Sequence, residues 1–449
     1  MNIFNFWKTG TDKPPLQDQS DIDRLYKKYR LSVMLAVTIG YGLAYPLRLA
    51  LSAMKKSLID TNIFSASELG AIGSALLYSY AFGKFFNGFL ADHANVKRFF
   101  ATGVLLSALM NILIFQSTLL WWWIILWGLN GWFQGFGAPT GAVVLANWFS
   151  NRERGRMYGI WSTAHAIGEG LTFIVSATLV TYFGWKAGFW APGLFCVLVA
   201  AGIYFTLQDR PQTFGLPPVA DWKDDHTAES MQQSKKSTNT LKVQLKIFKI
   251  PAIWILGLSS ALMYVTRYAI NSWGFLYLQE EKGYSLVQAG SILGLNTLAG
   301  IAGCVAYGFI SDKLFNARRP PVNLIFAVAE VAALAVIFFS PPGHPVLLTA
   351  AFVVYGFTLS GLLAALGGLF AIDIAPKQAA GAVMGFIGIF SYMAAGLQDQ
   401  ISGILIDRGT TMVDGVRHYD FSTAILFWIG GSVLSMILAA TLWRTKIRE

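Results

Sequence analysis

The feature that most constrains this chain is a series of twelve apolar runs, each long enough to cross a lipid bilayer as a helix. Spanning the hydrocarbon layer takes about 20 mainly apolar residues. The runs lie near 31–51, 67–90, 99–119, 121–146, 157–182, 188–207, 252–278, 286–310, 322–340, 345–371, 379–404 and 421–443. We therefore expect an all-α membrane protein with twelve transmembrane helices.

Composition leads to the same expectation. Only 13% of the 449 residues are charged, whereas about 25% are charged in an average soluble protein. That is too little charge to cover two or three soluble domains, so the chain should be solvated mainly by lipid. The two cysteines, Cys196 and Cys304, both lie in apolar runs, which argues against a disulfide framework.

One long polar stretch, about 208–248, separates the sixth apolar run from the seventh. We interpret it as a linker between two halves. The chain is thus expected to comprise a cytoplasmic N-terminal segment (1–30), a six-helix bundle (31–207), a cytoplasmic linker (208–248) and a second six-helix bundle with a short cytoplasmic tail (249–449).

The placement of lysine and arginine predicts the orientation. Cytoplasmic segments of membrane proteins are enriched in these residues, and most of the 34 in this chain fall in the N-terminal segment, the linker, the C-terminal tail and alternate loops. Both termini should therefore be cytoplasmic, in a bacterial-type inner membrane. The basic residues expected in outer loops are Lys55, Lys56, Lys186, Lys282, Arg408 and Arg417. Since topology accounts for most of the net charge of +10, we do not expect nucleic-acid binding.

An internal repeat relates the two halves. A Gly-x-x-x-Asp pattern followed by basic residues occurs at the end of the second run and again, 220 residues later, at the end of the eighth. An aspartate at a helix end, with basic residues across a short loop, can hold two helices together on the inner face. The candidate cytoplasmic gating residues are Gly88, Asp92, Arg98, Gly308, Asp312 and Arg318. Parallel repeats with a ligand site at their interface are one known transporter architecture.

Three basic residues, Arg48, Lys84 and Arg267, lie inside predicted spans. Placing a guanidinium at membrane depth costs at least about 2.5 kcal/mol, so such residues usually serve a function. Arg48 and Arg267 recur at a spacing of 219 residues, so they should occupy equivalent positions in the two halves. Two facing arginines repel unless an anion lies between them, and their planar donors suit phosphate. Lys84 could add positive potential there, pair with a carboxylate or reach the interface.

Other polar residues accompany the arginines. Tyr45 precedes Arg48 by three residues and Tyr264 precedes Arg267 by three, a match that favours a binding surface over core packing. His165 and Glu169 are four residues apart and should share a helix face. They could form a structural pair, His165 could bind phosphate, or the two could handle protons.

Two motifs carry a family resemblance. Tyr41-Gly-x-x-Tyr45-x-x-Arg48 and Tyr264-x-x-Arg267-x-x-Ile-Asn-x-Trp273 resemble the first-helix and seventh-helix motifs of the organophosphate:phosphate antiporters, in the hexose-phosphate transporter and sensor branch of the major facilitator superfamily. The segments 130–135 and 209–217 also match. The resemblance implies the major facilitator fold, with two pseudo-symmetric six-helix bundles.

The resemblance also implies a site. It places Arg48, Arg267 and His165 at the substrate phosphate. The candidate residues of the substrate pathway are Tyr41, Tyr45, Tyr80, Lys84, Glu169, Tyr264, Asn271, Trp273, Tyr392 and Asp399. For Asp399, substrate contact and helix pairing remain open. The chain departs from the family pattern where Leu49 replaces a lysine and where Glu169 replaces a glycine.

The implied function is exchange of a sugar phosphate, such as glucose 6-phosphate or another hexose 6-phosphate, for inorganic phosphate by alternating access. Two unneutralised arginines in an empty site would make this exchange obligatory. The alternatives are a sensor that reports external hexose phosphate to a partner histidine kinase, and proton-coupled organophosphate uptake. The sequence has no P-loop, metal-ligand spacing or nucleophile arrangement, so we expect no enzyme activity, cofactor or metal. We expect a monomer.

Overall fold

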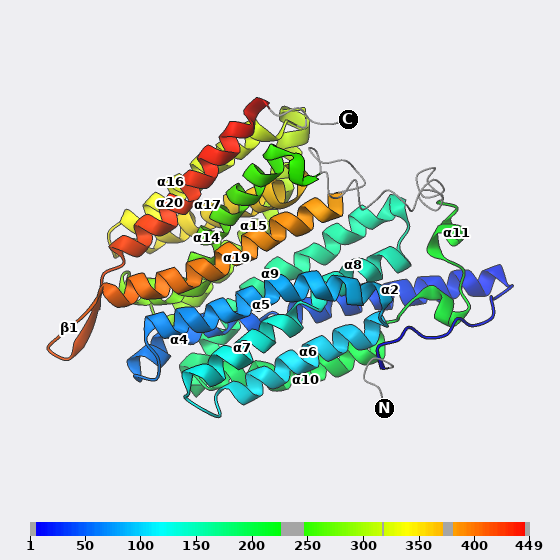
Figure 1. Cartoon of the computed structure of the whole chain (residues 1–449), viewed down its shortest axis with the longest axis horizontal. Coiled ribbons are helices and arrows are strands. Elements are labelled where there is room, and N and C mark those ends of the chain that lie inside the picture. The colour runs from blue at the N-terminus through cyan, green and yellow to red at the C-terminus, as the bar shows by residue number, and fades with distance from the viewer. Residues whose placement is uncertain (1–5, 226–246, 317, 371–379, 445–449) are drawn as a thin grey trace.

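The computed structural model describes residues 6–225, 247–316, 318–370 and 380–444 (Figure 1). The first half consists of α2 (Gln19–Leu43), α3 (Pro46–Leu49), α4 (Leu51–Asp60), α5 (Ala66–His93), α6 (Val96–Ile114), α7 (Leu120–Gln134), α8 (Gly137–Trp148), α9 (Asn151–Phe183) and α10 (Ala187–Thr206). The short helices η1 (Pro211–Phe214), α11 (Val219–Lys223) and η2 (Ile247–Lys249) follow.

The second half consists of α14 (Pro251–Glu280), α15 (Leu286–Phe309), η3 (Ile310–Leu314), α16 (Arg319–Phe339), α17 (Pro345–Ala364), η4 (Ala365–Leu369), α19 (Ala380–Arg408), α20 (Ser422–Thr441) and η6 (Leu442–Arg444). Between α19 and α20, β1 (Thr410–Val413) and β2 (Val416–Tyr419) form an antiparallel hairpin that pairs Thr410 with Tyr419. In Figure 1 this hairpin lies at one end of the molecule, and both chain termini lie toward the other.

The expected twelve-helix architecture is confirmed. Nine helical segments in the described part of the chain are long and apolar enough to cross a membrane by length and composition alone. The fourth expected crossing is divided into α7 and α8, while α5 and α19 complete the set. The repeat also appears in helix capping, because α5 and α15 both begin with a capping box, at Ser65 and Ser285. These two serines are 220 residues apart, the same spacing as the gating motifs.

The first crossing is longer than expected and is broken in its middle. It runs from Gln19 to Asp60, divided into α2, α3 and α4. Pro46 lacks a backbone N–H and so cannot continue the helical hydrogen bonds. Carbonyls freed inside a membrane must find other donors, and Asn111 and Asn130 both donate to the Leu47 carbonyl, at 2.9 and 2.7 Å. This arrangement fixes the short helix that carries Arg48.

Two helix pairs, α5 with α19 and α9 with α15, hold the halves together through small residues. A Cβ at Gly70 would lie 2.6 Å from the Asp399 carbonyl oxygen, and one at Gly294 would lie 3.0 Å from the Gly170 carbonyl oxygen. Small residues allow such close approach of membrane helices. The two halves are thus in close contact on the side toward the hairpin, where these glycines leave no room for a larger side chain.

Polar contacts between the halves also gather toward the hairpin. Asp407 accepts hydrogen bonds from the backbone N–H groups of Ala66 and Ser67 at the start of α5. Lys56 forms an ion pair with Glu280, and Arg417 donates to the Ile59 carbonyl and to Asn62. In the described structure, this end of the molecule is therefore closed.

The close packing at Gly73 leads to a testable prediction. A Cβ there would lie 1.7 Å from the Asp399 Oδ2 atom, whereas a Cβ at Gly202 in α10 would meet nothing within 4 Å. We expect Gly73→Ala to separate α5 from α19 and to increase labelling of a cysteine introduced at the Glu280 position. Gly202→Ala is the control and should leave labelling unchanged. Equal labelling in both variants would contradict the packing.

The first part of the expected linker packs against the first half. The Trp148 indole donates to the Asp209 carbonyl at 3.1 Å, and the Trp222 ring stacks on Tyr26 at 4.1 Å. The Asp209 carboxylate accepts from the Val96 N–H at the start of α6, and burial raises the pKa of this carboxyl. Residues 209–223 therefore pack against the first bundle on the side opposite the hairpin. The domain boundaries at 30, 207 and 248 remain a prediction.

Candidate functional site

Arg48 lies beside a pocket between the two halves. Its guanidinium carbon is 4.2 Å from the centre of the Tyr45 ring and 5.2 Å from that of Tyr80. The pocket is lined by Arg48 from α3 and, from the other half, by Tyr268, Asn271, Ser272 and Asp399. Arg48 forms no ion pair with a carboxylate among the residues that the structure describes. It is a half-buried cation that lies against aromatic rings, and without a paired carboxylate its guanidinium can bind an incoming anion.

Arg267 in α14 is already paired. Its Nη2 atom lies 3.1 Å from Glu169 Oε2, and the other carboxylate oxygen, Oε1, accepts a 2.6 Å hydrogen bond from Asn271. The expectation that an empty site leaves both arginines unneutralised is therefore wrong, because Glu169 supplies a negative charge to one of them.

His165 is bound to the first half rather than to Glu169. Its Nδ1 atom lies 2.5 Å from the Tyr45 hydroxyl, and its ring centre lies 4.7 Å from that of Tyr41. Of the alternatives for His165 and Glu169, a hydrogen-bonded pair does not occur in this structure, since within the described residues no hydrogen bond joins them. Tyr45 instead connects His165 to Arg48, because its hydroxyl bonds His165 and its ring faces Arg48.

Aromatic rings connect the surroundings of the two arginines. Tyr80 packs against Tyr392 at 4.7 Å between ring centres, and Tyr392 packs against Tyr264 at 5.4 Å. Arg267 lies over Tyr264 at 5.5 Å, and Lys84 lies 5.7 Å from the centre of the Tyr392 ring. The structure thus brings these five predicted residues together in one cluster, with contributions from both halves.

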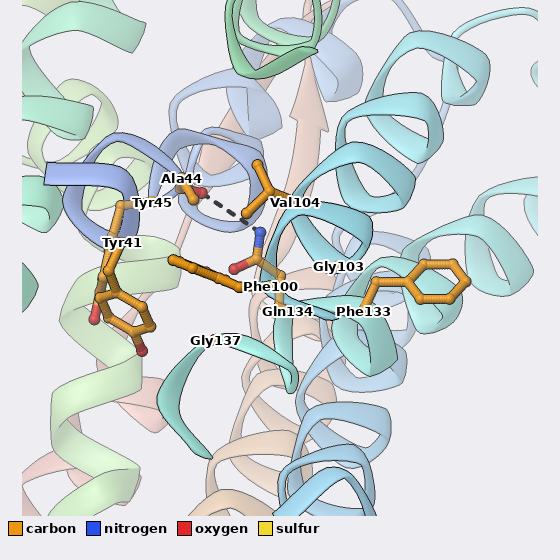
Figure 2. A pocket seen from close by; sticks show the side chains of 9 residues that line it. All are labelled: Tyr41, Ala44, Tyr45, Phe100, Gly103, Val104, Phe133, Gln134 and Gly137. Atoms are coloured by element: carbon orange, nitrogen blue, oxygen red, sulfur yellow. Dashed lines mark hydrogen bonds between the residues drawn. The ribbon is translucent and has the colours of Figure 1, made fainter. Parts of the chain in front are cut away.

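A second pocket lies within the first bundle, beside Tyr41 and Tyr45 (Figure 2). Figure 2 shows Gln134 reaching toward the break in the first crossing, where its amide donates to the Ala44 carbonyl at 3.4 Å. The same amide donates to Ser107 at 2.8 Å. Gln134 belongs to the 130–135 segment of the family resemblance, and its contacts stabilise the backbone that presents Tyr45 and Arg48.

Lys55 is the clearest error of the topology expected from the sequence. It does not lie in an outer loop but in α4, where its side chain is 1% exposed. It forms a 3.0 Å ion pair with Asp399 of α19, which is 2% exposed, and donates to Ser272 of α14 at 2.6 Å. Its ammonium also lies 3.4 Å from the centre of the buried Trp273 ring. Asp399 therefore pairs helices across the interface and also borders the pocket.

The expected gating residues lie at or near helix ends, on the side of the molecule opposite the hairpin. Gly88 and Asp92 lie in the last turns of α5, and Gly308 lies in the last turn of α15. Asp312, in η3, pairs with Arg319 at 2.8 Å, so its partner is the residue after the predicted Arg318. In the first half, Arg98 donates to the Phe6 carbonyl at 3.0 Å.

The fold and the two-part site define a class of protein, and the comparisons agree. A family model described as Major Facilitator Superfamily matches residues 31–398. This chain belongs to the major facilitator superfamily and is a multi-pass membrane protein.

Three relatives place the chain more closely. It is 35% identical to the membrane sensor protein UhpC of Escherichia coli, over 87% of this chain and 89% of the relative. It is 31% identical to the glycerol-3-phosphate transporter of Bacillus subtilis, over 96% of each chain. It is 32% identical to a probable hexose phosphate transport protein of Chlamydia pneumoniae, over 88% of this chain and 89% of the relative. The family resemblance inferred from the motifs is confirmed.

Solved structures share the fold. A bacterial homolog to the human lysosomal transporter Spinster, in an inward-facing and unoccupied conformation, has a TM-score of 0.71 at 17% identity, covering 93% of this chain and 95% of that one. A D-xylose–proton symporter has a TM-score of 0.68 at 16% identity, covering 94% and 98%. At this identity the likeness concerns the fold alone.

Proposed function

We propose that this chain is a secondary active transporter that exchanges a sugar phosphate for inorganic phosphate. The observation that carries the proposal is the pair Arg48 and Arg267, one from each half, beside one cluster of aromatic rings at the interface. A phosphate with several acceptor oxygens can satisfy both guanidinium groups at once. The hexose phosphate and glycerol-3-phosphate transporters among the relatives favour this substrate class.

The proposed mechanism is alternating access. The substrate phosphate binds Arg48 and Arg267, with His165 beside it, while tyrosine rings and hydroxyls contact the sugar. Each arginine belongs to a different half, so binding draws the halves together around the phosphate. The halves then rock so that the site opens to the other side. The remaining candidates, Lys84, Glu169, Asn271, Trp273, Tyr392 and Asp399, line or border this pathway.

We further propose a bacterial inner membrane with the chain termini on the cytoplasmic side, because the basic segments gather there. The hairpin end would then face outward, and its interhelical contacts would form the outer gate. Gly88, Asp92, Arg98, Gly308, Asp312 and Arg318 would belong to the inner gate.

The test is counterflow in proteoliposomes. Vesicles loaded with inorganic phosphate should take up labelled glucose 6-phosphate, and unlabelled inorganic phosphate outside should inhibit that uptake. Labelled glucose, which lacks the phosphate, is the control and should not enter. Vesicles containing the protein that take up no sugar phosphate under these conditions would contradict the proposal.

A second candidate function is sensing. It is favoured by the 35% identity to two membrane sensor proteins named UhpC, from Salmonella typhimurium and Escherichia coli. In that case the same site would bind external hexose phosphate and signal to a partner histidine kinase. Saturable binding of glucose 6-phosphate without counterflow would favour sensing. Uptake into phosphate-free vesicles that requires a pH gradient would instead favour proton-coupled uptake.

A further inference from the structure

Glu169 is bonded to Arg267, one of the two residues to which the proposed mechanism binds the substrate phosphate. It extends from α9 of the first half to α14 of the second, where Arg267 and Asn271 both donate to it. Its side chain is 7% exposed, while that of Arg267 is 23% exposed. A carboxylate at this depth is stable only when paired and hydrogen-bonded, and these two donors meet that need.

The two arginines are therefore unequal in the described structure. Arg267 has a carboxylate at 3.1 Å, whereas Arg48 faces the rings of Tyr45 and Tyr80. A phosphate that binds both must compete with Glu169 at Arg267 but displaces no ion-paired carboxylate of the described residues at Arg48, since Asp399, which lines the same pocket, pairs with Lys55. The local charge of the empty site is thus one unit lower than two arginines alone would give.

The hydrogen bonds of Glu169 show how the exchange can occur. Arg267 donates to Oε2 and Asn271 donates to Oε1. A phosphate oxygen can therefore replace Oε2 at the guanidinium while Asn271 still holds Oε1. The carboxylate then needs to move only far enough to release one of its two donors.

We propose that Glu169 is a resident counter-anion, which neutralises Arg267 when the site is empty and which the substrate phosphate displaces. The inference rests on the proposed function, because it assumes that phosphate binds between the arginines. It also goes beyond that function. Since the empty site keeps an internal contact across the halves, the carrier can reorient without a bound anion, and exchange is not obligatory.

The first test measures binding of inorganic phosphate to the purified protein in detergent. Glu169→Gln keeps the shape and the hydrogen bond to Asn271 but removes the competing charge. Loss of a charge-assisted competitor should tighten phosphate binding about tenfold. Glu169→Ala is measured in parallel and should shift the affinity in the same direction. An unchanged affinity in both variants would overturn the inference.

The second test compares two fluxes of labelled glucose 6-phosphate in proteoliposomes. The first is net uptake into phosphate-free vesicles, and the second is counterflow into phosphate-loaded vesicles. The wild type should perform both. Glu169→Gln should lose most net uptake but keep counterflow, because Arg267 is then neutralised only when an anion is bound. Asp21→Asn is the control, since Asp21 is a carboxylate that pairs with an arginine, Arg24, on the exposed start of α2 and belongs to neither proposed gate. It should keep the wild-type ratio of the two fluxes.

The outcomes separate the inference from the proposed function. Wild-type protein that exchanges glucose 6-phosphate but shows no net uptake would overturn the inference and leave the proposed function standing. Wild-type protein that binds neither inorganic phosphate nor glucose 6-phosphate would overturn both.

Discussion

Replacing either Arg48 or Arg267 with lysine is expected to weaken binding of glucose 6-phosphate by roughly tenfold to a hundredfold, the equivalent of one charge-assisted hydrogen bond. Lysine keeps the positive charge but loses the planar pair of donors that matches phosphate. Arg48→Lys also loses the stacking of the guanidinium on Tyr45. Equilibrium titration of the purified variants with glucose 6-phosphate measures the effect.

Two comparisons sharpen this prediction. Arg24→Lys is the control, because Arg24 lies on the exposed start of α2 and pairs only with Asp21 among the described residues. It should bind as the wild type does. The double variant with both lysines should bind no more tightly than the weaker single variant. Wild-type affinity in both single lysine variants would exclude a two-arginine phosphate site.

Removing one partner of the Lys55–Asp399 pair is expected to produce the largest loss of stability. Both side chains are almost completely buried, and Ser272 bridges them, donating to Asp399 at 2.7 Å. Leaving one charge buried without its partner costs about 3–5 kcal/mol. Lys55→Met and Asp399→Leu should each lower the free energy of unfolding by that amount, as measured by denaturation in detergent.

The double variant decides whether the loss arises from charge or from packing. Replacing a whole buried ion pair with apolar residues is often neutral or stabilising, so Lys55→Met combined with Asp399→Leu should recover most of the loss. The free energy of unfolding of Lys282→Met is measured for comparison. This variant also removes a buried ammonium, one that donates to the Phe338 and Ser340 carbonyls. A double variant as unstable as the sum of the single variants would show that packing, and not charge pairing, is responsible.

Much of the fold could be predicted because it depends on local patterns. Twelve apolar runs, the basic residues between them and the 220-residue repeat are all visible in the sequence. The repeat also predicted that Arg48 and Arg267 occupy equivalent positions. The structure adds the break near Pro46, where Asn111 and Asn130 both donate to the Leu47 carbonyl.

The pairing of charges could not be predicted from local spacing. Glu169 is four residues from His165 along its helix, yet it reaches across the interface to Arg267, which is 98 residues away in sequence. Lys55 pairs with Asp399, 344 residues away. A signal was nevertheless present, because Lys55 follows Arg48 by seven residues inside an apolar run and an intramembrane aspartate needs a partner. With the first span ending at 51, however, Lys55 falls in an expected outer loop, where it needs no buried partner.

The competition of three ligands for one site tests the central claim most directly. Purified wild-type protein is titrated with labelled glucose 6-phosphate, and the bound label is then displaced with inorganic phosphate or with glucose. A phosphate site between Arg48 and Arg267 predicts full displacement by inorganic phosphate, no displacement by glucose, and loss of both phosphate and sugar phosphate binding in the double lysine variant. Displacement by glucose, or retention of the label in saturating inorganic phosphate, would contradict the account.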